Sequence, residues 1–324
     1  MPYRFFLDGN KMTLISLLIV FALEFHFKIG SEYRNFSWFN KIQQYLSDRF
    51  SENDFFESWG GIAIILLSPL ALLYGALNLF DGSLFWLLSL AISIAILFLC
   101  LGPLPLEKSF EHYFKAVEND DLEAAYLHLN RVGSSNEINK GDEITGNVDI
   151  EQDDYSRQDE IGQNSPDIAE KDELIRNATR KILTESQKRY FGVIAWFIVL
   201  GPLGALFYRL SYLYHAHCKT AEFDEHLPLM DQIIHWIEWV PARITSMLFL
   251  LTGDFVNGFY RIQDYLTDAD ADNNQLISET GIASLGLEMG INDGDVNENH
   301  RTMALVNRTI IFYLVLGAVI STIF

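Results

Sequence analysis

The stretch 191–213, FGVIAWFIVLGPLGALFYRLSYL, decides the fold class of this chain. At about 1.5 Å of helical rise per residue, about 20 apolar residues cross the roughly 30 Å hydrocarbon core of a bilayer. The stretch is long enough, yet it carries Gly201, Pro202 and Gly204 near its centre. Because proline removes a backbone hydrogen bond, we predict a membrane helix that is kinked at Pro202, with the glycines leaving room for a neighbouring backbone.

Apolar and acidic residues are segregated along the rest of the chain. It has 324 residues, of which 49% are hydrophobic, and a formal net charge of −20. The strongly apolar segments, which we expect to be membrane helices, are 13–27, 59–80, 84–106, 191–213 and 307–324. This pattern predicts an all-α, polytopic integral membrane protein with about four to five transmembrane helices and additional amphipathic interfacial helices.

Pro69 and Pro241 also lie inside apolar segments. Pro69 falls near the middle of segment 59–80, at a depth that matches Pro202. Two helices broken at the same depth can open a polar pocket, although prolines also serve as packing devices. Pro241 lies in segment 231–252, which also contains charged residues. A charge at a helix centre costs roughly 2.5 to 3.5 kcal/mol on insertion scales, so we predict that 231–252 is interfacial or re-entrant.

The segment 133–173 divides the chain into two membrane regions. It holds 13 Asp or Glu against three Lys or Arg and has no apolar periodicity, which predicts a disordered acidic insert. The N-terminal region, 12–132, ends in a predicted amphipathic helix or helix pair at 107–132, and the C-terminal region is 174–324. We treat 1–11 as a possible misassigned extension before Met12.

The distribution of Lys and Arg sets the expected orientation. Basic residues are retained on the cytoplasmic side, and they are concentrated in 28–58 and at both ends of 107–190. We therefore expect these two loops to be cytoplasmic, while the orientation of the first helix stays open. The scattered basic residues form no patch, which excludes nucleic acid as an expected partner.

Two possible metal sites are incomplete. The stretch 268–279, DADADNNQLISE, has the oxygen spacing of a calcium loop but lacks the glycine at position 6, so we prefer a solvated loop with a helix N-cap. His215 and His217 point to different faces of a helix, which argues against zinc. We expect no metal, no cofactor and no disulfide between Cys100 and Cys218.

The stretches ESQKRYFGVIAWFIVLGPLGALFYRLSYLY (185–214) and WIEWVPARITSMLFLLTGDF (236–255) resemble the AmpE family. The opening MTLISLLIVFALEFHFK (12–28) is similar too, with Glu24 at a position where AmpE proteins carry a glutamate. The resemblance implies a protein of the bacterial inner membrane that modulates β-lactamase induction in response to cell-wall turnover. It also implies a functional partner, the amidase AmpD.

AmpE proteins belong to the adenosylcobinamide-phosphate synthase superfamily, whose synthases form an amide bond. Gln187, Lys188 and Arg189 stand where those synthases carry an Asp, so the resemblance favours a regulatory protein without catalytic residues. A membrane amide-forming enzyme and a transporter stay as alternatives. We expect a polar pocket that contacts a small muropeptide-like or phosphate-bearing ligand, besides membrane lipids. Its candidate residues are Glu24, Glu185, Arg189, Arg209 and Arg243, although Arg189 and Arg209 also fit simple membrane-flanking cations.

Overall fold

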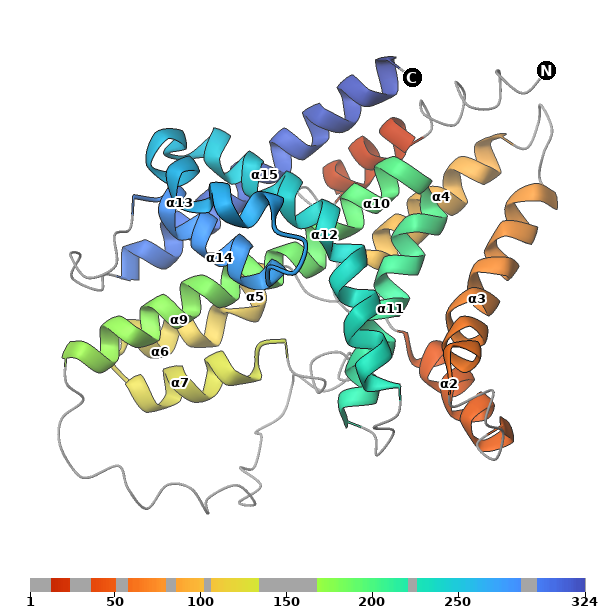
Figure 1. Ribbon diagram of the computed structural model, residues 1–324, viewed down its shortest axis with the longest axis horizontal. Helices are drawn as coiled ribbons and strands as arrows, with labels where there is room; N and C mark the ends of the chain where they lie inside the picture. Colours follow the sequence, from red (N-terminus) through yellow and green to blue (C-terminus); the bar gives the residue numbers. More distant parts are fainter. Residues whose placement is uncertain are drawn as a thin grey trace.

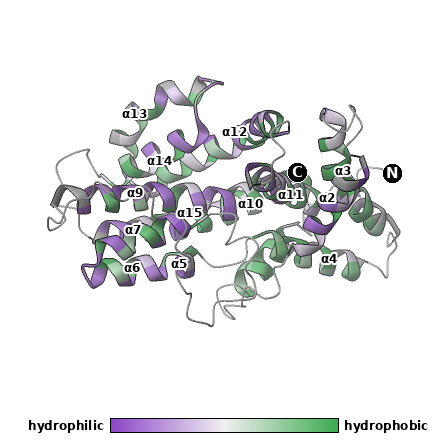
Figure 2. Cartoon of the chain, turned by 90° about the horizontal axis from the view of Figure 1, so that it is seen from below, coloured by the Kyte–Doolittle hydropathy of each residue, from purple (hydrophilic) through white to green (hydrophobic). Residues whose placement is uncertain are grey.

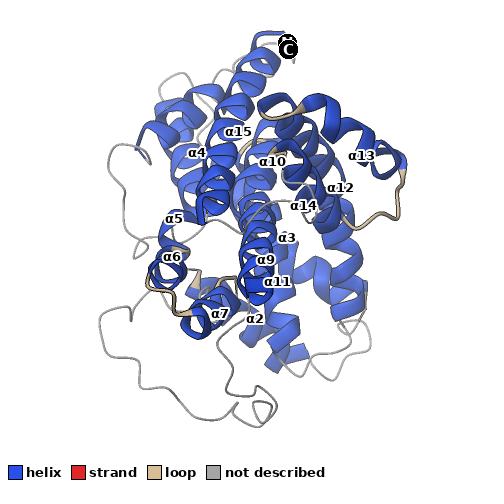
Figure 3. Cartoon of the chain, turned by 90° about the vertical axis from the view of Figure 1, so that its left-hand side faces the viewer, coloured by secondary structure: helices blue, strands red, loops and turns tan. Residues whose placement is uncertain are grey.

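The computed structural model describes residues 13–23, 36–50, 58–79, 86–101, 106–133, 168–220, 226–286 and 296–323. Every regular element within these ranges is a helix (Figure 3), which confirms the all-α prediction. The predicted extension 1–11, Glu24 and most of the acidic insert lie outside the described residues.

Two of the described helices are long and apolar enough to cross a membrane, by length and composition. One is Trp59–Leu77, within α3 (Trp59–Leu79), and the other is Glu298–Ser321, within α15 (Val296–Ile323). They coincide with two of the predicted crossings, and Pro69 lies inside α3 as expected.

The other apolar segments near the N-terminus form shorter helices. Thr13–Leu23 covers part of the first predicted crossing, and α4 (Trp86–Cys100) covers part of the third. A polar helix, α2 (Ser37–Phe50), precedes α3. Figure 2 shows α3 and α4 mostly in the hydrophobic colour at one end of the molecule, and the more polar α6, α7 and α9 at the other.

The predicted amphipathic segment 107–132 contains a helix pair. The pair is α6 (Glu111–Glu118) and α7 (Leu122–Arg131), and the single turn α5 (Leu106–Ser109) precedes it. The side chains that carry the apolar period, including Phe110, Val117 and Leu129, are buried. The helix-pair form of the prediction is therefore confirmed.

A long helical segment follows the acidic insert. It consists of α9 (Ile168–Ser186), the π-helical turn η3 (Gln187–Phe191) and α10 (Gly192–Leu200), which follow one another directly (Figure 1). Since α9 begins at Ile168, the insert ends earlier than the predicted boundary at 173. Short π-helical turns inside α-helices are rare and are found frequently at functional sites.

The prediction of one kinked helix over 191–213 is wrong. The helix ends at Leu200, and Gly201 takes φ 65° and ψ −150°, a conformation essentially restricted to glycine. The chain then returns along α10 as α11 (Pro202–Thr220). Pro202 is the first residue of α11, where its missing N–H costs no helical hydrogen bond. The Gly-Pro pair therefore makes the turn of an antiparallel helical hairpin.

Four C-terminal helices follow. They are α12 (Leu227–Thr252), α13 (Phe255–Thr267), α14 (Asn273–Ser284) and the long α15. Of these, α12 and α15 pack on this hairpin. Pro241 lies inside α12, which continues through it, and α12 contacts α10, α11, α14 and α15. Whether α12 is interfacial or re-entrant stays a prediction.

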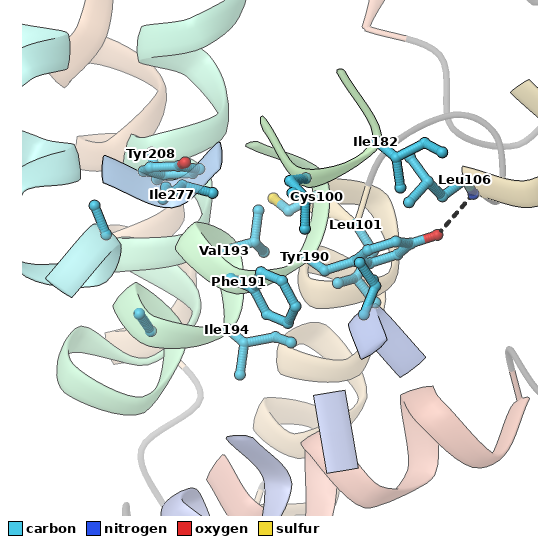
Figure 4. Close-up of a cluster of buried hydrophobic side chains, with 14 of the residues drawn as sticks. Cys100, Leu101, Leu106, Ile182, Tyr190, Phe191, Val193, Ile194, Tyr208 and Ile277 are labelled. Atoms are coloured by element: carbon cyan, nitrogen blue, oxygen red, sulfur yellow. Dashed lines mark hydrogen bonds between the residues drawn. The ribbon is translucent and has the colours of Figure 1, made fainter. Parts of the chain in front are cut away.

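The hydrophobic core joins α4, η3, α10 and α11. Figure 4 shows part of it, with Phe191, Val193 and Ile194 close to Cys100 and Leu101. The Leu106 backbone N–H donates a hydrogen bond to the Tyr190 hydroxyl oxygen at 3.0 Å. The core therefore ties the π-helical turn to the start of α5.

Candidate functional site

Charged side chains gather where α9 passes into η3. The Glu185 carboxylate accepts hydrogen bonds from Lys188 Nζ and from Arg189 Nε, each at 3.2 Å. Glu185 and Arg189 are both buried. Burial raises the pKa of Glu185, but the charges of Lys188 and Arg189 outweigh burial and hold the pKa below its ordinary value of 4.5. Glu185 is therefore a buried, ionised carboxylate.

Other segments cover this ion pair. Arg189 Nη1 donates to the Ser109 hydroxyl of α5 at 2.6 Å. The backbone of Gly133, just after α7, lies so close that a Cβ there would be 2.6 Å from Glu185 Oε1. Gly133 also has a φ of 75°, in the left-handed region that favours glycine. The C-terminal end of the helix pair α6–α7 thus lies directly against the Glu185 carboxylate.

Arg209 of α11 adds a third cation to the group. It is 7% exposed, and its guanidinium carbon lies 5.8 Å from the centroid of the Phe36 ring. The charges of Arg189 and Glu185 both act on it. The structure thus brings together three of the predicted pocket residues, Glu185, Arg189 and Arg209. We call these residues, with Lys188, the central ion cluster.

A second buried carboxylate lies beside this cluster, and the sequence analysis did not select it. Glu238 of α12 is 2% exposed and accepts hydrogen bonds from the Tyr208 hydroxyl at 3.3 Å and from the Tyr212 hydroxyl. The charge of Lys188 also acts on Glu238. The only signal in the sequence is a glutamate between two tryptophans in WIEW. Tyr208 and Tyr212 lie one helical turn apart on α11, and only the packing of α11 on α12 brings their hydroxyl groups to Glu238.

The π-helical turn also reaches the last helix. Thr245 Oγ1 donates to Gln187 Oε1 at 2.7 Å and lies 2.7 Å from the Tyr313 hydroxyl. Tyr313 also donates to the Pro241 carbonyl oxygen at 3.3 Å. Polar contacts of η3 therefore reach α5 through Ser109 and α12 through Thr245, and Thr245 extends them to Tyr313 of α15.

The family profile described as "Regulatory signalling modulator protein AmpE" matches residues 12–132 and 157–324. This match covers most of the chain and every residue of the central ion cluster. The chain belongs to the AmpE family. The resemblance found in the sequence is thereby confirmed.

Two curated relatives of this AmpE-family chain carry the name "Cobalamin biosynthesis protein CobD". One, from Chromobacterium violaceum, is 26% identical over 71% of the chain and 64% of its own length. The other, from Stutzerimonas stutzeri, is 29% identical over 39% of the chain and 43% of its own length. The chain therefore spans less than two thirds of either relative, and no solved structure matches it.

Arg243 does not join the central ion cluster of this AmpE protein. Its guanidinium packs 3.9 Å above the Trp239 ring. Its N–H groups donate to Asn273 Oδ1 and to the carbonyl oxygens of Trp239, Tyr265, Leu266 and Asp268. Arg243 thus fastens the end of α13 and the following loop to α12, which is a structural task.

The remaining candidates have simple structural explanations. Asp272 caps α14 by accepting from the Asn274 N–H at 2.9 Å, which confirms the N-cap preferred for the acidic loop. His215 pairs with Asp231 at 2.7 Å and so joins α11 to α12. The described part of the chain contains no group of three metal-ligating side chains. Cys100 and Cys218 are both free and buried.

Proposed function

We propose that this protein is a regulatory component of the bacterial inner membrane that modulates β-lactamase induction in response to cell-wall turnover. The observation that carries the proposal is the AmpE match, described as a regulatory signalling modulator, over both regions that build the central ion cluster. AmpE proteins are functionally linked to the amidase AmpD, and we place this chain in the same response.

The polar contacts of η3 support a signalling role. Glu185 and Arg189 hold the turn against Ser109, while Gln187 holds it against Thr245. These contacts come from helices that are far apart in sequence, so a change at one of them alters the fit of the others. A turn of this kind can pass a binding event from one helix to its neighbours without any chemical step.

A membrane location is supported by several features. Two helices have the length and composition of membrane spans. At the tip of the α10–α11 hairpin, Val199 and Leu200 are 69% and 54% exposed, which is unfavourable in water and favourable in lipid. We propose a multi-pass protein in which this hairpin enters the bilayer from one side. Such short hairpins are tolerated at membrane depth where other helices surround them.

The alternative is a membrane amide-forming enzyme, and the two CobD-named relatives favour it. The hydrogen bonds that the buried carboxylates already accept argue against this enzymatic alternative. Glu185 is bound by Lys188 and Arg189, and Glu238 by Tyr208 and Tyr212. A carboxylate that positions or deprotonates an amine needs free access to that amine. Glu185 and Glu238 are therefore both occupied by the protein's own groups.

The test is complementation of a strain that lacks the gene. Wild-type protein should restore normal β-lactamase induction by a cell-wall antibiotic, whereas Glu185→Gln, produced at equal abundance, should not. Arg180→Gln, an exposed arginine on α9, is the matched control and should complement. Normal induction without the gene would refute the regulatory role. Complementation of a corrinoid auxotroph lacking the synthase would instead establish the alternative.

A further inference from the structure

The buried charges around η3 are paired unevenly. Arg189 and Arg209 are buried cations, Glu185 and Glu238 are the buried carboxylates beside them, and the Lys188 side chain is 32% exposed. Both Lys188 and Arg189 are already bonded to Glu185. An uncompensated charge in a buried site is strongly unfavourable unless a counter-ion accompanies it. Arg209 is the buried cation of this group that forms no ion pair with a described residue.

Arg209 has the contacts of a cation without an anion. Its Nε is buried and has no hydrogen-bond partner among the described residues. Within the same part of the chain, no carboxylate lies within ion-pair distance of its guanidinium. Its guanidinium lies over the Phe36 ring, and the Cys100 thiol, Tyr208 and the charges of Arg189 and Glu185 also act on it. Arg189 repels Arg209, and the Glu185 carboxylate that attracts Arg209 is already bonded to Lys188 and Arg189.

We propose that Arg209, supported by the charge of Arg189, binds the phosphate group of a ligand. A guanidinium presents a planar fork of N–H donors that matches phosphate oxygens, and two neighbouring guanidinium charges match a doubly charged phosphate better than a single carboxylate. Arg189 is held in place by Glu185 and Ser109, so its charge is fixed before the ligand arrives. Phosphate binding would compensate the unpaired charge of Arg209 and link α11 to η3.

Two sources share this chemistry, a soluble phosphate ester and a phospholipid headgroup. The direct test uses full-length protein purified in a non-ionic detergent and exchanged into phosphate-free buffer. Thermal unfolding is then measured with inorganic phosphate and with chloride at equal ionic strength. Phosphate should raise the unfolding temperature of the wild type, as expected for any ligand that binds only the folded state.

The decisive variant is Arg209→Gln, which removes the charge and keeps a similar length. It should unfold at the same or a higher temperature than wild type in phosphate-free buffer, because the unpaired charge is gone. Its apparent affinity for phosphate should fall by about tenfold or more. Arg209→Lys keeps the charge but lacks the planar fork of N–H donors. Its apparent affinity for phosphate should lie between those of the wild type and Arg209→Gln. Arg180→Gln, the control, should respond like the wild type.

An equal phosphate response in wild type and Arg209→Gln would overturn the proposal. So would a large loss of stability in Arg209→Gln without phosphate, because it would show that Arg209 already has its partner within the fold. A second arm adds phosphatidylglycerol or, as its phosphate-free counterpart, diacylglycerol. Stabilisation by phosphatidylglycerol alone, lost in Arg209→Gln, assigns the site to a lipid. Stabilisation by inorganic phosphate and soluble esters assigns it to a soluble ligand.

The biological role of this ligand rests on the proposed function, but its binding does not. If Arg209→Gln loses phosphate binding and still complements β-lactamase induction, the site stands and its link to induction fails. If the gene itself has no effect on induction, the proposed function fails and the binding result is unchanged.

Discussion

Gly192 and Tyr208 touch across the α10–α11 hairpin, and a Cβ on Gly192 would lie 2.1 Å from the Tyr208 hydroxyl oxygen. Tyr208 is fully buried and donates to Glu238. Because residue 192 has no side chain, α10 and α11 pack closely. The same close packing sets the position of Tyr208, which donates to Glu238. No local pattern in the stretch 191–213 indicates this contact.

Gly192→Ala should destabilise the protein, because the added methyl group must displace the buried Tyr208 ring. Overpacking of this kind costs about 1 to 3 kcal/mol. We expect a lower unfolding temperature in detergent. The control is Gly75→Ala in α3, where nothing lies within 4 Å of the added Cβ. An unchanged unfolding temperature in Gly192→Ala would show that the hairpin is packed less closely than described.

Gly201→Ala should destabilise the turn without any clash. No atom lies within 4 Å of a Cβ at residue 201, but its φ of 65° strains any other residue. We expect a loss of about 1 to 3 kcal/mol. Pro202→Ala should lose less, since alanine also suits the first position of a helix. If Pro202→Ala were the more damaging in thermal unfolding, the proline rather than the glycine would determine the turn.

Stability should depend on Glu185 in a defined pH range. Its pKa is lowered on folding, so its contribution is present above the unfolded value of 4.5 and is lost as the pH falls through the folded value. Glu185→Gln leaves Arg189 without its carboxylate and should lose about 3 kcal/mol at neutral pH. Unfolding temperatures of the two proteins should differ most near neutral pH and approach each other below pH 4.5. A difference that grows on acidification would contradict this assignment.

Arg243→Lys should loosen the segment that follows α13. Lysine keeps the charge but cannot reproduce the fork of N–H donors that reaches Asn273 and the backbone carbonyls of residues 265–268. We expect a loss of about 3 kcal/mol and faster proteolysis near residue 268. The phosphate response should be unchanged, because Arg243 is not part of the central ion cluster. Loss of the phosphate response in Arg243→Lys would show that Arg243 belongs to the ligand site.

Some features of this protein follow from local sequence alone. The apolar segments predict helices, and they are found in α3, α4 and α15. The period of Phe110, Val117 and Leu129 predicts the buried face of the helix pair, and Asp272 predicts an N-cap. Each of these depends on neighbours within a few residues, because helical periodicity and capping are properties of short segments.

The tertiary structure alone decided the hairpin and the partners of the buried charges. A Gly-Pro pair fits both a kinked helix and the start of a new one, and only the packing of α11 back along α10 selects the second. Arg209 and Arg243 look alike in the sequence, yet one meets the like charge of Arg189 and the other meets backbone carbonyls. The charge of a side chain is set by its residue type. The partner that compensates this charge is set by contacts between distant segments, such as Tyr208 with Glu238.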